Sequence, residues 1–246
     1  MSYIIEIAVT DYTSAASAVK GGADRIELCS ALSEGGLTPS YALIETCIND
    51  FDVPVFPIIR PRSGDFLYTA KEFELIQKDA LMCKQLGCQG IVTGFLLKDG
   101  NIDKERISVI TKSVYPMQVT FHRAFDRCLD PFKGLEDIIE AGCHRILTSA
   151  QELKATEGTA LMRQLTEAAK GRIIIMPGSG VRKENIKELA EKTGATEFHS
   201  SLKSLSKSRM EFIHPAFAEA EGDYVSATVD PGEVKALRKA LLESIL

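Results

Sequence analysis

The chain has 246 residues, 45% of them hydrophobic, and a formal net charge of -5 at pH 7. This length and apolar content suffice for a large buried core, whereas the negative charge argues against a nucleic-acid partner because no basic face can neutralise phosphates. No apolar stretch approaches the length of a membrane span, and the first apolar run follows Met1 without a basic leader, so we expect a cytoplasmic protein with no membrane partner.

A short pattern recurs four times along the chain. Each copy begins with glycine followed by alanine or cysteine and ends in an alternating run with small polar groups: Gly22–Cys29, Gly87–Gly94, Gly142–Ser149 and Gly194–Ser201. Four further β-rich runs accompany the copies: Tyr3–Val9, Val53–Arg60, Met117–His122 and Arg172–Met176. Eight strands alternating with helical stretches predict an α/β protein with a single (β/α)8 TIM-barrel domain over residues 1–246.

Side chains alternate along a strand, so the repeated strands predict which residues face the barrel interior. Arg25, Arg145 and Glu197 would form the lowest interior layer. Because buried charges need partners, we expect these three to form structural ion pairs and not a functional site. Cys29 and Ser201 would lie at the C-terminal mouth, where this fold carries its chemistry.

The first three predicted strands bring charged residues to the mouth. Glu6 and Glu27 lie in phase with the inward-facing positions of strands one and two, and Arg60 and Arg62 follow strand three. Guanidinium groups suit bidentate binding of carboxylate or phosphate, so both arginines are candidate anion ligands. The alternative is that they pair with Glu6, Glu27 or Asp65 and hold the mouth together.

The fifth predicted strand ends in His122, four residues before Asp126. Alternation turns His122 inward at the mouth, where a histidine beside a carboxylate has the chemistry of a general acid–base. Its carboxylate partner would be Glu27 or Glu6, and Arg60 would clamp the substrate. These five residues are the candidate catalytic set; the alternative is a histidine satisfied by Asp126 or by a backbone carbonyl.

Small residues follow the last two predicted barrel strands. Gly178, Ser179 and Gly180 come after strand seven, and Ser200 and Ser201 end strand eight. In this fold these loops form a common phosphate site, since glycine lets backbone N–H groups approach an anion. With the two arginines after strand three, they are the candidate anion-binding residues. The glycines could instead only form a tight turn.

A segment of unusual composition, residues 202–230, separates the eighth predicted strand from a last helix near Pro231–Ile245. Loops this long are usually lids, interfaces or disorder. Phe212, Phe217 and Tyr224 are apolar anchors. We therefore expect an ordered loop that packs over the mouth or on a neighbouring subunit of a homo-oligomer.

The cysteines are scattered, and none forms a Cys-x-x-Cys motif: they are Cys29, Cys47, Cys83, Cys88, Cys128 and Cys143. In a chain of this length such a distribution does not indicate a disulfide framework. Cys88 and Cys143 occupy the alanine position of the repeat, where a small thiol packs. We expect structural, unpaired thiols.

Several blocks closely resemble the CutC family of copper-homeostasis proteins: Glu27–Ser30, Glu34–Ser40, Ile59–Phe66, Val119–Asp126, Arg145–Ser149 and Glu197–Ser201. The resemblance extends over nearly the whole chain and implies a cytoplasmic (β/α)8 barrel that handles copper. It also implies that monovalent copper binds cysteine near the first two strands, which here is Cys29. Several relatives carry a second cysteine in the first strand, at the position of Ala8.

Copper(I) prefers two or more sulfur ligands. With Ala8 beside Cys29, Met176 is the remaining candidate for a thioether ligand. The sequence therefore leaves two hypotheses. One is a copper-homeostasis protein that binds monovalent copper weakly. The other is an enzyme that acts on a small phosphorylated or carboxylated metabolite at the mouth, with substrate and reaction left open.

Overall fold

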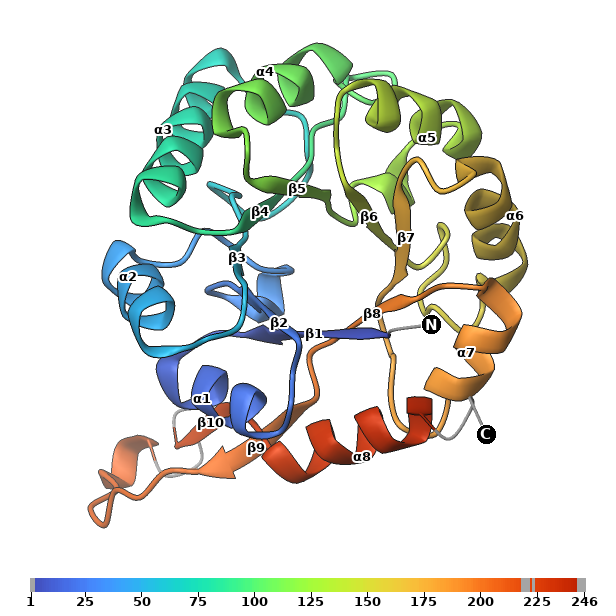
Figure 1. Ribbon diagram of the computed structural model, residues 1–246. Coiled ribbons are helices and arrows are strands. Elements are labelled where there is room, and N and C mark those ends of the chain that lie inside the picture. The colour runs from blue at the N-terminus through green and yellow to red at the C-terminus, as the bar shows by residue number, and fades with distance from the viewer. Residues whose placement is uncertain (1–2, 218–221, 223, 243–246) are drawn as a thin grey trace.

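The computed structural model describes residues 3–217, 222 and 224–242. Eight parallel strands form a ring with helices outside it (Figure 1). The strands are β1 Ile4–Val9, β2 Arg25–Leu28, β3 Val55–Pro57, β4 Gly90–Thr93, β5 Gln118–Phe121, β6 Arg145–Thr148, β7 Ile174–Pro177 and β8 Glu197–Ser200. They pair in the orders β3-β2-β1-β8 and β4-β5-β6-β7, and a parallel bridge between Ile58 and Val92 links β3 to β4. The predicted (β/α)8 barrel is confirmed.

Several of the helices begin at a residue whose side chain caps them. They are α1 Tyr12–Lys20, α2 Tyr41–Asp50, α3 Ala70–Leu86, α4 Lys104–Val114, α5 Pro131–Glu140, α6 Thr159–Ala169, α7 Ile186–Thr193 and α8 Pro231–Leu242. Asp11 and Ser40 accept hydrogen bonds from the first turns of α1 and α2, and Thr69 and Glu72 form a capping box at α3. Such caps satisfy N–H groups that the helix itself leaves without partners.

The repeated glycine has a backbone role. Gly22, Gly87, Gly142 and Gly194 all have positive φ, between +71° and +90°, just before β2, β4, β6 and β8. Only glycine adopts this left-handed conformation freely, and it ends the preceding helix. The small residue that follows is buried in every copy. The repeat is therefore the turn that returns the chain from each odd-numbered helix to the next strand.

Two separate apolar clusters confirm the predicted alternation. The large one lies between strands and helices and includes Ile26, Leu28 and Ile146, whereas a small one inside the barrel contains Cys29 and Phe56. A Cβ at Gly90 would lie 2.4 Å from the Phe56 ring, so the interior is closely packed at this level. All six cysteines are buried and free, as expected.

The predicted ion pairs form the floor of the barrel. Arg25 Nη2 lies 2.6 Å from Glu197 Oε2, and Arg145 Nε lies 2.6 Å from the same oxygen. Arg25 Nε also contacts Glu6 Oε2 at 2.5 Å. This layer is structural, and Glu6 belongs to it.

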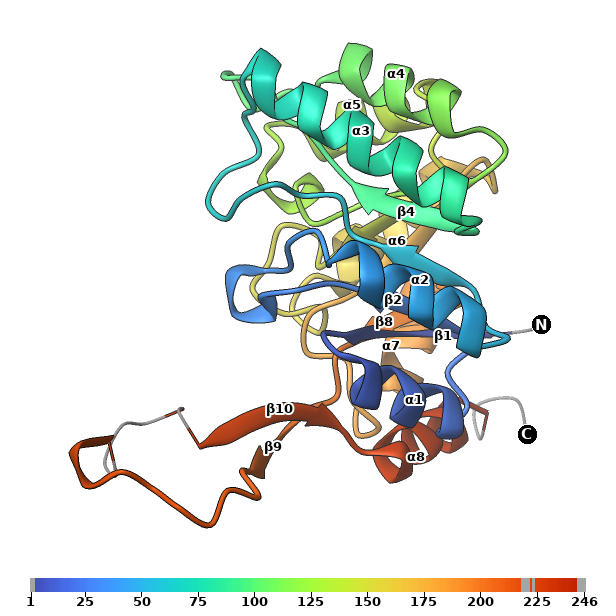
Figure 2. The ribbon, with the colours of Figure 1, turned by 90° about the vertical axis from the view of Figure 1, so that its left-hand side faces the viewer.

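The segment 202–230 contains secondary structure that was not expected. Two antiparallel strands, β9 Lys203–Lys207 and β10 Val225–Val229, form a hairpin that projects beyond the barrel wall (Figure 2). Phe212 and Phe217 are 68% and 54% exposed, so these anchors do not pack over the mouth of their own barrel. Packing on a neighbouring subunit stays a prediction. Residues 218–221, 223 and 243–246 lie outside the described residues.

Among the described helices, none is both long and apolar enough to cross a membrane.

Candidate functional site at the barrel mouth

A cavity of about 490 Å³ opens at the C-terminal mouth of the barrel. Its described wall carries four cationic side chains, Arg60, Arg123, Arg127 and Lys203, against the carboxylates of Glu27 and Glu34. Two histidines, His122 and His199, also line it. A concave site with an excess of positive charge favours a small anionic ligand.

Arg60 is buried at the cavity wall with only 4% of its surface exposed. It pairs with none of the carboxylates considered for it. Its Nη1 instead donates to the carbonyl oxygens of Glu34 and Gly36, at 2.6 and 3.1 Å, and its Nη2 donates to that of Gly64 at 2.8 Å. Arg60 Nε is buried and has no partner among the described residues. The side chain thus fixes two mouth loops, and its Nε–H is not used in doing so.

Arg62 lies outside this cavity. Its guanidinium pairs with Glu72 Oε1 at 2.6 Å and Asp65 Oδ1 at 3.0 Å, and it also donates to the backbone carbonyls of Ser63, Asp65 and Leu67. These contacts occupy all the donors of its planar fork. Arg62 therefore follows the alternative given above: it pairs with carboxylates, Asp65 among them, and holds the loop together.

His122 lines the cavity, but none of the carboxylates that the structure describes forms a hydrogen bond or ion pair with it. Its Nδ1 accepts a hydrogen bond from the backbone N–H of Ala124 at 3.2 Å, which places the ring proton of the neutral form on Nε2. Burial, reinforced by the charge of Arg60, lowers the pKa of His122 to about 3. Nε2 is buried and has no partner among the described residues. At neutral pH His122 is therefore a hydrogen-bond donor, and its expected pairing with Glu27 or Glu6 is not present.

The histidine that does contact a carboxylate is His199 on β8. Its Nδ1 lies 2.7 Å from Glu6 Oε1, because β1 pairs with β8 in a register that places Glu6 opposite His199. Burial disfavours the imidazolium, but Glu27 and Glu6 outweigh it and raise the pKa of His199. His199 was not among the site residues predicted from the sequence. Its inward-facing position in the fourth copy of the repeat was the feature that could have indicated it.

Glu27 lies on the cavity wall and is 5% exposed. Its Oε2 is buried without a hydrogen-bond partner among the described residues. Burial, reinforced by the negative charge of Glu6, raises the pKa of Glu27 to about 7. For Glu6, burial also opposes ionisation, but Arg25 and His199 prevail and lower its pKa to about 2.

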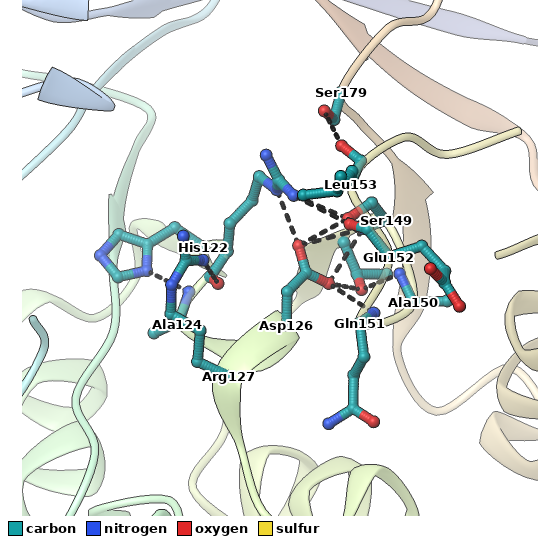
Figure 3. A network of polar contacts seen from close by, with 12 residues as sticks. His122, Ala124, Asp126, Arg127, Ser149, Ala150, Gln151, Glu152, Leu153 and Ser179 are labelled. Atoms are coloured by element: carbon teal, nitrogen blue, oxygen red, sulfur yellow. Dashed lines mark hydrogen bonds and ion pairs between the residues drawn. The ribbon is translucent and has the colours of Figure 1, made fainter. Parts of the chain in front are cut away.

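Asp126 belongs to a hydrogen-bond network beside the cavity (Figure 3). Its carboxylate accepts from Arg123 Nε at 2.7 Å, from the Ser149 N–H at 3.0 Å and from the Thr148 hydroxyl. Arg123 also donates to Ser149 Oγ at 2.7 Å. Because Arg123 lines the cavity and Asp126 does not, the geometry makes Asp126 a residue that positions Arg123.

The loops after β7 and β8 supply part of the wall. Ser179, Gly180, Ser200 and Ser201 line the cavity, whereas Gly178 lies behind it against Leu147. The Ser200 hydroxyl donates to the carbonyl of Val181 at 2.7 Å. Helix α7 begins only at Ile186, and none of its residues is part of the described wall. Any anion contact here would come from the loop and not from a helix N-terminus.

The CutC family model matches residues 3–204. The human copper homeostasis protein cutC homolog is 42% identical over 99% of this chain and 90% of its own length. The CutC family protein of Chromobacterium violaceum is also 42% identical, over 98% of this chain and 99% of its own. The chain belongs to the CutC family. The matched region ends within β9, so most of the hairpin and α8 lie outside it.

Solved structures agree with the fold. The crystal structure of CutC from Streptococcus agalactiae has a TM-score of 0.77 and 30% identity, and covers 81% of this chain and 98% of its own. A native KDPGal structure has a TM-score of 0.61 at 15% identity, a likeness that concerns the barrel alone.

The CutC family name implies copper as cargo, but the residues here do not fit monovalent copper. Cys29 Sγ is fully buried, lies 3.5 Å from the Val9 carbonyl oxygen and is not part of the described cavity wall. Burial, together with Glu27, raises the pKa of the Cys29 thiol well above its ordinary range. Position 8 is alanine, and Met176 Sδ accepts from Arg25 Nη2 at 3.3 Å. The soft two-sulfur set that copper(I) prefers is not assembled by these residues.

Proposed function

We propose that this CutC family member is an enzyme that acts on a small anionic metabolite bound at the mouth of the barrel. The observation that carries the proposal is a pair of buried donors, Arg60 Nε and His122 Nε2, that have no partner within the described part of the chain and belong to side chains lining the same cavity. Leaving a buried donor unsatisfied costs about 1–3 kcal/mol. A carbonyl, carboxylate or phosphate oxygen is the kind of acceptor that each of these donors lacks.

The rest of the cavity wall supports the same proposal. Arg127 and Lys203 are exposed at the mouth, where they would attract an anion from solvent. Glu27 and His199, with Glu6 in contact with His199, supply the groups that would act on the bound molecule. A carrier of one soft metal ion would need none of these cationic side chains.

We expect small anions to raise the melting temperature of the wild-type protein in buffer containing EDTA. Phosphate, sulfate, small carboxylates and sugar phosphates should be compared by thermal scanning. A ligand at a hundred times its Kd stabilises by about 2.7 kcal/mol, which corresponds to roughly 5–10 °C for a domain of this size. Arg127→Met should reduce the shift because it removes an exposed cavity cation without breaking a buried ion pair.

Arg62→Met is the matched control, since this guanidinium is tied to Glu72 and Asp65 away from the cavity. It should retain the full anion-induced shift. If none of the anions moves the wild-type transition, or if both variants respond alike, the proposed function is wrong.

For monovalent copper we expect only weak binding. An anaerobic titration against a competing copper(I) chelator should show no tight one-to-one complex, because Cys29 is a single buried thiol with a raised pKa. Cys29→Ser should reduce the residual binding further, and Cys47→Ser, at a buried thiol on α2, is the control. A tight complex abolished by Cys29→Ser would instead favour copper as the cargo.

A further inference from the structure

Three side chains from adjacent strands converge at the floor of the cavity. Glu6 on β1, Glu27 on β2 and His199 on β8 each offer one ligand atom, and these atoms all lie within 4.8 Å of one another. Ligand atoms around one such metal ion lie roughly 3–4 Å apart, because metal–N and metal–O bonds are about 2.0–2.2 Å long, so small side-chain shifts would bring these atoms around one ion. An imidazole with carboxylates is a donor set for divalent first-row transition metals and not for soft monovalent copper.

Glu27 provides a second, independent observation. The residue is 95% buried by its 5% exposure, and its Oε2 has no hydrogen-bond partner among the described residues. A buried carboxylate oxygen is costly unless a hydrogen bond or a cation compensates it. In the part of the chain that the structure describes, no guanidinium forms an ion pair with Glu27, and those of Arg25 and Arg145 pair with Glu6 and Glu197.

The hydrogen bond between His199 and Glu6 decides the roles of the three residues. Nδ1 of His199 lies 2.7 Å from Glu6 Oε1, so Nε2 is the nitrogen left to bind a metal. His199 and Glu27 line the cavity, whereas Glu6 does not. A carboxylate on the far nitrogen of a metal-binding histidine holds the ring orientation and its tautomer. Glu6 therefore fits the role of the carboxylate that holds the histidine, and not that of a metal ligand.

We propose that Glu27 and His199 bind a divalent transition-metal cation at the floor of the cavity, with Glu6 positioning His199. Of these three residues Glu27 and His199 face the cavity, which is one ligand fewer than a catalytic zinc site usually has, so the other coordination positions would be filled by water or by an oxygen of a bound molecule. The part that the cation would play in catalysis rests on the proposed function; the binding of the cation does not.

The test uses protein freed of metal with EDTA and then exchanged into chelator-free buffer. Mn²⁺ binding is followed by loss of the free-ion EPR signal, and Zn²⁺ binding by competition with a chromophoric chelator. We expect one ion per chain, with Kd for Mn²⁺ raised at least tenfold by Glu27→Gln and by His199→Gln. Glu34→Gln, at another carboxylate of the cavity wall, should leave Kd unchanged.

A measurement on the wild-type protein keeps the proposal open to refutation even where a variant folds poorly. Pulsed EPR of bound Mn²⁺ should show nitrogen coupling from one imidazole. Binding no tighter than millimolar, a Kd unaffected by Glu27→Gln, or bound Mn²⁺ without nitrogen coupling would overturn the site. The anion-induced shift is measured in EDTA, so its loss and the loss of metal binding are separate results.

Discussion

Replacing Arg25 with methionine should lower the free energy of unfolding by about 3–5 kcal/mol. Arg25 is 4% exposed and contacts both Glu6 and Glu197 inside the barrel. Methionine retains most of the apolar stem but leaves two buried carboxylates without this cation, and breaking a buried ion pair from one side has a cost of this size. Urea denaturation at pH 7, with the wild-type protein alongside, measures the difference.

Arg62→Met is the matched control for this prediction as well. The Arg62 side chain is 36% exposed and its partner Asp65 is 73% exposed, so solvent screens the pair. Exposed ion pairs contribute about 0–1 kcal/mol, and we expect a change in this range. If Arg25→Met also changed stability by no more than this, the floor of the barrel would not depend on the ion-pair layer.

The second large effect concerns His122 and pH. In the folded protein the pKa of His122 is about 3, whereas an unfolded histidine has a pKa of about 6.5. Because the folded pKa is the lower one, the stabilisation from a neutral His122 is present above pH 6.5 and is lost as the pH falls toward 3. Between pH 7 and pH 4.5, the unfolding free energy should fall by about 2–3 kcal/mol relative to His122→Gln.

The comparison with His122→Gln is necessary because Glu27 acts in the opposite direction. Its folded pKa is raised to about 7, so its contribution to stability is lost as the pH rises from about 4.5 to 7. In the wild-type protein the two contributions partly cancel, and only the difference between the two proteins isolates His122. Urea unfolding curves of both proteins at several pH values measure this difference in unfolding free energy. Parallel pH dependences would show that His122 takes up a proton in the folded state.

The sequence alone was sufficient to predict the barrel and the character of its interior. Strand periodicity and the repeated glycine depend on local backbone conformation, which the residues themselves determine: the four repeat glycines have positive φ, as a helix end requires. Alternation likewise placed Arg25, Arg145 and Glu197 in one layer, and all three meet there. Such features need only the period of a strand and the requirement that buried charges find partners.

The candidate site could be predicted only in part, because its pairings depend on contacts between distant strands. Alternation shows that Glu6 and His199 face inward, but the register of β1 against β8 decides that they meet across 193 residues of chain. The same limit applies to Arg60, whose guanidinium binds carbonyl oxygens that only the folded loops bring within reach.

The hairpin shows the same division between local pattern and tertiary structure. All five residues of β9 are exposed and only Val229 of β10 is buried, so their periodicity resembles that of a loop. The two strands pair from Lys203 with Val229 to Lys207 with Val225. This pairing arises from backbone hydrogen bonds, which cannot be predicted from amino-acid composition. Sequence by itself thus determined the fold and the burial of its charges, whereas the tertiary structure decided which charges meet. The reason is that a side chain's direction is a local property and its partner is not.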